Sequence, residues 1–251
     1  NKNKIFTGYD AINNKYFTEA SRAIKDKSNN KFRDKEKEYQ LPSKYFLSLG
    51  RLVKKKNLKL LIIAYFKYTQ FYLDKNQKIP SSLVFVGDGE EKEKLLNLVR
   101  ELGLNCYDFS QDFNKVTSIN KSAKKGSVYF YGFKQIDENP IFYTKAKAFV
   151  LPSLYEEWGL VINEAMACSI PVLVSKVVGC VEDLMPKKSK FYKINKINFY
   201  KFLSLFSFER LSNEDLPELR DNGLIFNPLS DKSLSIALRY MEEGDKKNYN
   251  F

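Results

Sequence analysis

Residues 45–52, Tyr45-Phe46-Leu47-Ser48-Leu49-Gly50-Arg51-Leu52, decide the fold class. A run of strand-forming residues ends at a glycine, and apolar residues at helical spacing follow it: Leu58, Leu61, Ile62, Tyr65 and Phe66. A short apolar strand that turns at a glycine into an amphipathic helix is typical of the unit that builds parallel sheets. If this unit recurs along the chain, the fold is an alternation of strands and helices.

The unit does recur towards the C-terminus. Short runs of β-branched and aromatic residues predict further strands at 83–86, 128–131, 149–151, 171–174 and 224–226. Helical spacing predicts helices over 95–102, 160–169 and 234–241, the last with Ser230 as its N-cap. Apolar strands that alternate with helices predict an α/β fold, a Rossmann-like, doubly wound parallel sheet. Ligands bind such sheets at the carboxyl ends of the strands, so the residues that follow each strand are the candidates for function.

The composition excludes several classes of chemistry. The 251 residues contain no histidine, which excludes Ser-His-Asp and Cys-His catalysis and histidine-ligated metals within this chain. Cys106, Cys168 and Cys180 form no Cys-x-x-Cys pair, so neither a disulfide framework nor a zinc site is expected, and a reducing, cytoplasmic setting fits them. Lys and Arg number 42 against 30 Asp and Glu, which gives a formal charge of +12. Because the lysines are spread over the whole chain, we attribute most of this charge to compositional drift and expect no nucleic-acid partner.

Several segments lie outside the alternation of strands and helices. Residues 1–42 are polar and predict a solvated helical connector, and residues 245–251 predict a tail. The domain itself would then run over residues 43–244, with an enlarged loop at 105–126. The first residue is not a methionine, so we expect the sequence to begin partway through a longer chain.

Residues 186–218 predict an insert within that domain. The insert joins a basic start to an aromatic run from Phe199 to Phe208. One interpretation is an amphipathic helix in peripheral contact with a membrane, on its cytosolic face. The other is a surface insert whose aromatic side chains pack on the domain. The sequence leaves both open.

Two cations follow the first predicted strand, at the start of the next helix. Arg51 comes directly after Gly50, and Lys56 precedes the helix. The free amides and the dipole of a helix N-terminus favour anions, and two cations there add charge-assisted hydrogen bonds. These residues predict a phosphate site. Lys54 and Lys55 lie alongside and leave open a set of ordinary surface cations.

A second group of candidates follows the predicted strand at 149–151, in the stretch 156–165. Gly159 lacks a Cβ, so a ligand can approach the backbone, and the amides of Gly159 and Leu160 can bind an oxyanion. Glu164 can accept two hydrogen bonds from a vicinal diol such as a ribose, and Glu156 can reach a second set of hydroxyls. The alternatives are carboxylates that complement the helix dipole and, for Glu164, a solvated helix residue. Together the two groups indicate a ligand with a diphosphate between hydroxylated rings, which is a nucleotide-sugar.

An ordered set of motifs resembles the donor-binding half of the retaining glycosyltransferases of family 4, which have the GT-B fold. The motifs are Phe46-Leu47-Ser48-Leu49-Gly50-Arg51-Leu52 with Lys56, Val84-Phe85-Val86-Gly87-Asp88-Gly89, Val128-Tyr129-Phe130-Tyr131-Gly132, Glu156 through Ala167 with Pro171-Val172, and Asp221 through Pro228. The resemblance runs from about residue 43 to residue 240. It implies the C-terminal domain of a GT-B enzyme, with the N-terminal acceptor-binding domain absent from this sequence. Within residues 1–42, Ile5-Phe6-Thr7-Gly8-Tyr9-Asp10 resembles only the closing stretch of that domain. A single Gly-x-Gly turn would be a weak signal, whereas the ordered set is specific.

The resemblance implies an activity and a diphosphate site. Such enzymes transfer a sugar from a nucleoside-diphosphate-sugar to a glycan, lipid or small-molecule acceptor, with retention of the anomeric configuration. Arg51 and Lys56 would hold the diphosphate together with the backbone at Gly159 and Leu160. The family usually needs no metal at the diphosphate, so we expect neither a metal nor a cofactor.

The resemblance also implies roles for the remaining candidates. Glu164 would bind the ribose hydroxyls, and Glu156 would be the catalytic residue that contacts and orients the transferred sugar. Gly132 and Phe133 would lie in the region that holds the base.

The chain departs from the family pattern in ways that leave an alternative open. Asn57 stands where the family usually has a glycine, and Ser169-Ile170 stand where a glycine usually precedes the Pro-Val strand. Because the acceptor-binding half would be missing, the alternative is a non-catalytic nucleotide-sugar-binding module or partner subunit that lacks the acceptor domain.

Overall fold

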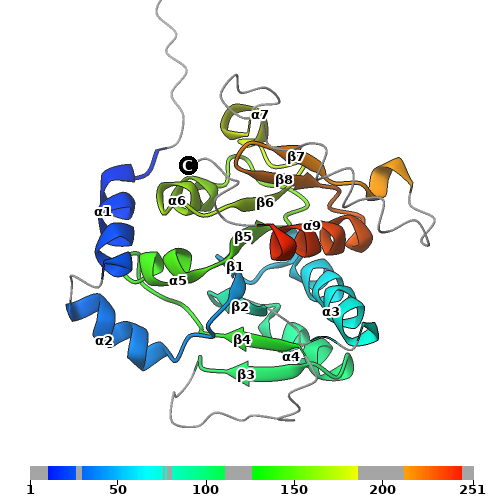
Figure 1. The fold of residues 1–251 in the computed structure, drawn as a ribbon, viewed down its shortest axis with the longest axis horizontal. Helices are drawn as coiled ribbons and strands as arrows, with labels where there is room; N and C mark the ends of the chain where they lie inside the picture. The colour runs from blue at the N-terminus through cyan, green and yellow to red at the C-terminus, as the bar shows by residue number, and fades with distance from the viewer. Residues whose placement is uncertain are drawn as a thin grey trace, which may run out of the picture.

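Strands from the described parts of the chain form one sheet in the computed structural model of the protein (Figure 1). The structure describes residues 11–26, 30–75, 77, 81–110, 126–185 and 212–244. Within these ranges the sheet has eight strands in the order β3-β4-β2-β1-β5-β6-β8-β7. Their bounds are β1 Tyr45–Leu49, β2 Ser82–Val86, β3 Asn105–Asp108, β4 Ser127–Phe130, β5 Ala148–Leu151, β6 Val172–Ser175, β7 Glu218–Arg220 and β8 Gly223–Phe226. All neighbours pair parallel except β7, which runs antiparallel to β8, so the predicted parallel α/β sheet is confirmed.

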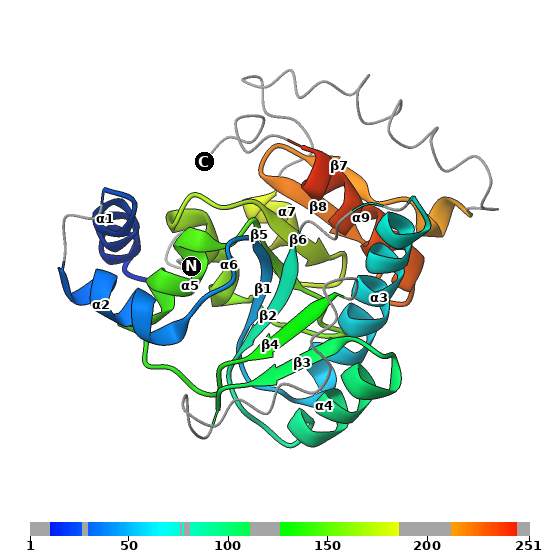
Figure 2. The ribbon, with the colours of Figure 1, turned by 60° about the horizontal axis from the view of Figure 1, so that its bottom comes forward.

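Helices cover both faces of this sheet (Figure 2). One layer consists of α3 Leu58–Asp74, α4 Lys92–Glu101 and α9 Asp231–Glu243, and the other of α1 Asn14–Lys25, α5 Asn139–Lys145 and α6 Leu160–Ala167. The other described helical segments are α2 Asn30–Tyr39, η2 Lys54–Lys56, α7 Val181–Leu184 and η3 Asn213–Asp215. Successive side chains of a strand point to opposite faces. On β1, Phe46 therefore packs into one apolar core and Tyr45 and Leu47 into the other, which explains why the strand is apolar except at Ser48.

The strand order locates the crevice in which ligands of such folds bind. Chain order runs outward from β1 to β2 and β4 on one side and from β5 to β6 and β8 on the other. The sheet therefore changes direction between β1 and β5, which pair directly through Phe46–Ala148 and Leu47–Phe149. In sheets of this kind, the crevice that binds ligands lies at the ends of these two strands, beside the loops that follow them. They carry Arg51 and Lys56 after β1, and the stretch from Glu156 to Gly159 after β5.

The structure corrects the predicted loop at 105–126 and shows secondary structure at the end of the predicted insert at 186–218. The enlarged loop expected at 105–126 starts with strand β3, which pairs with β4 over Asn105–Asp108. The insert expected at 186–218 ends with η3 and with Glu218, the first residue of the antiparallel edge strand β7. Both strands lie at the edges of the sheet, where half of the backbone groups need no partner strand and the apolar signal in the sequence is weak. Residues 111–125 and 186–211, and with them the predicted membrane-contacting stretch, lie outside the described residues.

The N-terminal segment is helical, as predicted, but one face of α1 is buried against the domain. Phe17, Ala20 and Ile24 occupy one face of α1 and are buried, and Phe17 and Ile24 belong to the core that α5 and α6 share with it. The Ser21 hydroxyl donates to the Cys168 carbonyl oxygen at 3.2 Å, beyond the end of α6. A stripe of three apolar residues on one side of a helix is enough to dock it, even when the average composition of the segment is polar.

Both departures from the family's glycine pattern lie at left-handed backbone positions. Asn57 has φ 53° at the start of α3, and Ser169 has φ 58° after α6. Asparagine tolerates this conformation better than most residues, and the Asn57 side chain adds a hydrogen bond to the Pro228 carbonyl oxygen at 2.8 Å. The backbone geometry that glycine would provide is therefore kept at both positions.

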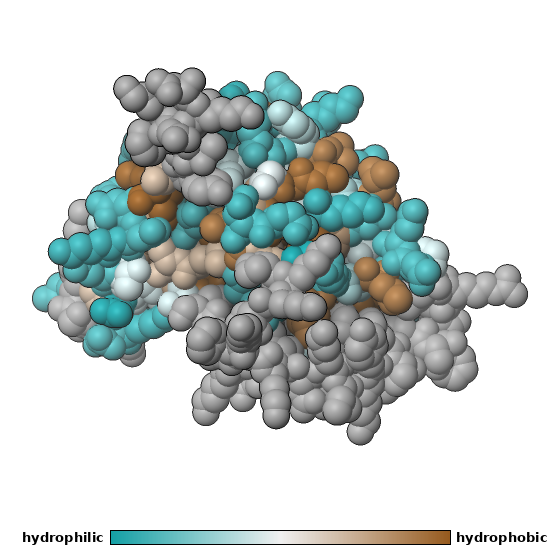
Figure 3. Space-filling view, turned by 90° about the horizontal axis from the view of Figure 1, so that it is seen from above, coloured by the Kyte–Doolittle hydropathy of each residue, from teal (hydrophilic) through white to brown (hydrophobic). Residues whose placement is uncertain are grey.

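The surface mixes polar and apolar side chains. The face seen from above in Figure 3 carries brown, apolar side chains in several separate groups between teal, hydrophilic ones. Single exposed apolar residues of this kind are usual on folded proteins. Of the helices in the described ranges, none is long and apolar enough to cross a membrane.

Candidate functional site

The loops that follow β1 and β2 run against each other and fix the position of Arg51. The Leu52 amide donates to the Asp88 carbonyl oxygen at 2.9 Å, and the Gly50 amide to that of Val86 at 2.9 Å. Gly87 has φ 133°, and a Cβ at that position would lie 2.0 Å from the Gly50 carbonyl oxygen. Only glycine permits this approach. The pair of loops therefore holds Gly50 and Arg51 at the end of the sheet as an extension of the β1–β2 ladder.

The two predicted cations flank Gly50 and differ in their surroundings. Arg51 is exposed and lines a cavity of about 480 Å³. Lys56, the last residue of η2, lies on the other side, with its Cε 4.0 Å from where a Cβ of Gly50 would be. Its ammonium forms an ion pair with Glu156, Nζ to Oε2 at 2.5 Å. The structure thus brings Lys56 and Glu156, 100 residues apart, into direct contact across the crevice.

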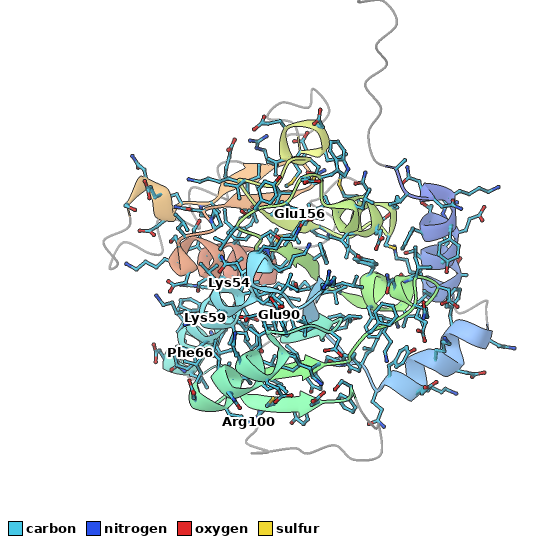
Figure 4. The ribbon with its side chains drawn as sticks, turned by 180° about the vertical axis from the view of Figure 1, so that it is seen from behind. Lys54, Lys59, Phe66, Glu90, Arg100 and Glu156 are labelled. Carbon is cyan, nitrogen blue, oxygen red and sulfur yellow. The ribbon has the colours of Figure 1, made fainter. Side chains whose placement is uncertain are left out.

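The β5–α6 loop presents Glu156 and Gly159 to the same crevice. The loop is tied to η2 by the Leu154 amide, which donates to the Lys55 carbonyl oxygen at 2.9 Å. Figure 4 shows Glu156 on this loop near Lys54 of η2. Gly159 has φ 92° and caps α6, and a Cβ there would lie 3.2 Å from side-chain atoms of Leu151 and Val178. The amide of Leu160, in the first turn of α6, has no partner within its own helix, so this end of α6 favours anions.

Glu164 is neither solvated nor exposed. The residue is 8% exposed and accepts a hydrogen bond from the Tyr143 hydroxyl at Oε2, 2.8 Å away. Burial raises the pKa of Glu164, and the bond from Tyr143 opposes this increase. The alternative of a solvated helix residue is therefore wrong. Among the contacts of the described residues, none joins Glu164 directly to Arg51 or Lys56. Glu164 lies about one turn after Leu160, the first residue of α6.

The predicted base-binding region borders the cavity that Arg51 lines. The Gly132 carbonyl oxygen accepts from the Gly87 amide at 2.8 Å, which fixes the loop after β4 against the loop after β2. Phe133 follows, is 67% exposed and lines the cavity. Arg51 and Phe133, 82 positions apart in the sequence, therefore share one cavity.

Three residues of this region were missed by the sequence analysis. Tyr143 was missed because the short helix α5 was not predicted, and its partner Glu164 is remote in sequence. Lys134 and Asn139, which line the cavity beside Phe133, were missed because no spacing rule links them to the motifs. Lys134 and Asn139 could have been identified from their position. Both follow the predicted strand at 128–131, in the region where α/β folds bind ligands.

The remaining reactive side chains lie away from this crevice or in the core. All three cysteines are free and buried. Burial raises the pKa of Cys106 to about 11 and those of Cys168 and Cys180 to about 12. Such thiols stay protonated near neutral pH and are poor nucleophiles. Within the described ranges no group of three or more Asp, Glu or Cys residues gathers in a way that suits a metal ion.

Comparison with proteins of known sequence finds glycosyltransferases. The serotype-specific mannosyltransferase WbdA of Escherichia coli is 28% identical over 160 residues, which cover 64% of this chain and 17% of that protein. A second relative, of Campylobacter jejuni, is 33% identical over 134 residues, or 53% of this chain and 28% of that protein. It is named N-acetylgalactosamine-N,N'-diacetylbacillosaminyl-diphospho-undecaprenol 4-alpha-N-acetylgalactosaminyltransferase. The chain thus spans less than a third of the length of each.

Solved structures share the fold at low sequence identity. The C-terminal domain of a glycosyl transferase group 1 family protein from Francisella tularensis superposes with a TM-score of 0.52, at 18% identity, over 88% of this chain and 87% of that one. The alpha,alpha-trehalose-phosphate synthase (UDP-forming) of Burkholderia xenovorans gives a TM-score of 0.59, at 12% identity, over 93% of this chain and 43% of that one. These neighbours support the GT-B type of fold for the chain.

The sequence pattern of one family extends over most of the sheet and both loops of the crevice. It is described as "Glycosyl transferases group 1" and matches residues 43–193, more than half of the 251 residues. The matched range contains Arg51, Lys56, Glu156 and Glu164. The chain therefore belongs to the glycosyl transferases group 1 family.

Proposed function

We propose that this chain is the donor-binding half of a retaining glycosyltransferase of family 4, which takes a sugar from a nucleoside-diphosphate-sugar. The observation that carries the proposal is the crevice at the β1–β5 switch point, where Lys56 meets Glu156 at 2.5 Å beside the glycine-capped start of α6. Arg51 and Lys56 are the cations beside these backbone amides, and a diphosphate that binds there would replace Glu156 as the partner of Lys56. The acceptor would be a glycan, a lipid or a small molecule. On this proposal it binds to a part of the enzyme other than the donor-binding half.

The positions of the cations assign different groups to the two phosphates of the donor. Arg51 is exposed at the rim of the crevice and offers a planar set of donors to one phosphate. Lys56 and the amides of Gly159 and Leu160 face the other. As the anomeric bond breaks, negative charge grows on the departing nucleoside diphosphate, and cations already in place stabilise it. On this proposal the reaction needs no histidine, a residue that the 251-residue sequence does not contain.

The two carboxylates would contact the hydroxylated ends of the donor. Glu164, buried and held by Tyr143, has a fixed orientation suited to the ribose diol. Glu156 lies 3.4 Å from the Ser153 hydroxyl and against Lys56, on the side of the diphosphate where the sugar would sit. We assign to it the orientation of the transferred sugar, and to Gly132 and Phe133 the side that receives the base.

A second candidate function is a non-catalytic nucleotide-sugar-binding module or partner subunit. The matched parts make up less than a third of the length of both relatives, and both candidate functions are compatible with that. Both candidates predict donor binding, and they differ in turnover. Release of nucleoside diphosphate from a nucleotide-sugar by the longest natural form of the protein favours the transferase, and binding without release favours the module.

Calorimetric titration tests the binding that both candidates share. Uridine and guanosine diphosphate-sugars are titrated into the chain and into Arg51→Ala. We expect Arg51→Ala to weaken binding about tenfold or more, because a charge-assisted hydrogen bond to a phosphate contributes about 1.5–3 kcal/mol. Arg100→Ala is the matched control, since Arg100 is exposed on α4, far from Glu156 in Figure 4. Equal affinities of Arg51→Ala and the unchanged chain would refute the phosphate site.

A further inference from the structure

A second cavity lies between helices α3 and α9. The two helices run side by side in one layer against the sheet (Figure 1). Residues between Lys67 and Asp74 of α3 and between Lys232 and Arg239 of α9 line the cavity. Its volume is about 400 Å³, within the range of sites for small ligands. None of the described residues that line it also lines the cavity beside Arg51, so the two cavities are separate.

Arg239 is the buried charge in this cavity. It is 6% exposed, and its guanidinium carbon lies 3.3 Å from the centroid of the Phe71 ring. Stacking engages the flat face of the guanidinium and holds the group in one orientation. The N–H groups lie in the plane of the guanidinium, where they can donate side by side to two oxygens of one anion. Because a guanidinium carries several donors, a ligand in the cavity can share it with partners inside the fold.

The charges in the lining favour an anion. Among the described residues of the lining, three are cations, Lys67, Lys232 and Arg239, and one is a carboxylate, Asp74. Lys67 also forms an ion pair with Asp231, Nζ to Oδ1 at 2.7 Å. The two side chains of this pair are 42% and 32% exposed, so the pair contributes little and Lys67 can turn to a ligand. Positive charge remains in excess even when Asp231 is counted.

Two further charges lie just outside the lining. The Lys75 ammonium lies over the Phe71 ring, 4.1 Å from its centroid. Burial raises the pKa of Glu243, and the charges of Arg239 and Lys75 oppose this increase. These two residues add one cation and one carboxylate, so the excess of positive charge around the cavity is unchanged.

The lining also contains groups that suit hydroxyls. Asp74 is exposed, and its carboxylate can accept hydrogen bonds from hydroxyl groups. Gln70, which is half-buried, carries both donors and an acceptor. A bare inorganic anion would use the cations alone, whereas a phosphate ester of a hydroxylated molecule would use both kinds of group.

We propose that the cavity between α3 and α9 binds the phosphate ester of a small hydroxylated molecule. Arg239 and Lys232 donate to the phosphate, and Asp74 and Gln70 bind the hydroxyls. This site goes beyond the proposed nucleotide-sugar function and does not depend on it, because the two cavities share no lining residue among those described.

Titration calorimetry with glucose 6-phosphate tests the site on the full chain and on Arg239→Met. Methionine can fill the space over Phe71 but cannot donate a hydrogen bond. We expect the unchanged chain to bind glucose 6-phosphate at least fivefold more tightly than inorganic phosphate, and glucose at the same concentrations not to bind. Arg239→Met should weaken binding of glucose 6-phosphate about tenfold or more, because a charge-assisted hydrogen bond to phosphate is lost.

Two further variants control for net charge and for the place of binding. Lys59→Met removes one positive charge at an exposed position in the first turn of α3, outside the cavity (Figure 4), and should change the affinity less than twofold. Arg51→Ala should also leave the affinity unchanged. A loss of binding in Arg51→Ala but not in Arg239→Met would place the phosphate in the crevice and overturn this site.

Other outcomes would also overturn the proposal. Absence of binding by the unchanged chain would refute the site and leave the nucleotide-sugar proposal to its own titration with uridine and guanosine diphosphate-sugars. Equal affinities for inorganic phosphate and glucose 6-phosphate would refute the contacts to hydroxyls. If Arg239→Met does not fold, Lys232→Met replaces a half-buried cation of the same cavity and should weaken binding at least threefold, and an unchanged affinity there would refute the site.

Discussion

The ammonium of Lys56 lies 2.5 Å from Oε2 of Glu156, and the two side chains are only 13% and 15% exposed. They come from the loops after β1 and β5, the two central strands of the switch point. The electrostatic attraction between a cation and a carboxylate is stronger when both are shielded from water than when both are exposed. In the unliganded chain Lys56 therefore already has an anionic partner, and a diphosphate has to compete with Glu156 for it.

Replacing Glu156 with glutamine should strengthen diphosphate binding. Glu156→Gln removes the competing carboxylate and its repulsion of the phosphates, and leaves Lys56 available to the ligand. We expect affinity for UDP or GDP to rise about three- to tenfold by calorimetry, while any sugar transfer by a longer form of the protein falls.

The control for this prediction is Glu157→Gln, a neighbouring exposed carboxylate on the same loop. It changes the net charge equally and has no ion pair with Lys56. A loss of nucleotide affinity in Glu156→Gln, or an equal gain in Glu157→Gln, would show that the ion pair does not compete with the ligand.

Tyr143→Phe should destabilise the fold and loosen Glu164. The variant removes the hydroxyl that donates to Glu164 Oε2 at 2.8 Å and leaves a buried carboxylate without that donor. We expect the free energy of unfolding to fall by about 1–3 kcal/mol in urea denaturation. Nucleotide affinity should fall as well, since the carboxylate loses its fixed orientation, whereas Tyr155→Phe, at an exposed position on the β5–α6 loop, should change neither quantity. An unchanged unfolding energy would contradict the prediction.

The pH dependence of stability should reveal the burial of Glu164. Burial raises the pKa of Glu164 in the folded chain above its unfolded value, so folding favours the protonated form. The associated stability is fully present below the unfolded pKa of about 4.3 and is lost as the pH rises through the folded pKa. Glu164→Gln, which stays neutral, should therefore be more stable than the unchanged chain at pH 7, and this advantage should vanish towards pH 4.

Urea denaturation at a series of pH values measures this difference. Glu90→Gln, at an exposed carboxylate in the β2–α4 turn, separates the effect of net charge from that of burial. A stability advantage of Glu164→Gln that is the same at pH 4 and pH 7 would be inconsistent with a carboxyl group whose charge is disfavoured by burial.

Gly87→Ala should disrupt the paired loops that carry Arg51. The new Cβ would lie 2.0 Å from the Gly50 carbonyl oxygen, and the backbone at φ 133° is unfavourable for alanine. We expect a loss of about 2–3 kcal/mol in the free energy of unfolding, from strain and overpacking together. Gly50→Ala shares a positive φ of 140°, but its Cβ would meet only Lys56 at 4.0 Å, so it measures strain without the clash. Equal decreases in the free energy of unfolding of the two variants would show that the loops relieve the clash without a further loss of stability.

The strands and helices of the central sheet were predictable because their signal is local. Tyr45–Leu49 is apolar except at Ser48 because both faces of β1 are covered, and the strand was predicted with the bounds that the structure gives it. Ser230 caps α9 as expected, accepting from the Ser233 amide at 3.0 Å. The edge strands β3 and β7 were not predictable in this way. A strand at the edge of a sheet can be short and polar, and its position depends on pairing with its one neighbouring strand.

The sequence by itself determined the fold class, the motif order and the candidate residues around the crevice, because each depends on spacing along the chain. Only the tertiary structure decided which of those residues meet. It paired Lys56 with Glu156, buried Glu164 against Tyr143, and placed Asn139 with Phe133 in the wall of one cavity. Strand order and loop geometry bring these distant positions into contact. The strength of each contact depends on how well the surrounding atoms exclude water. A local pattern of residues contains neither kind of information.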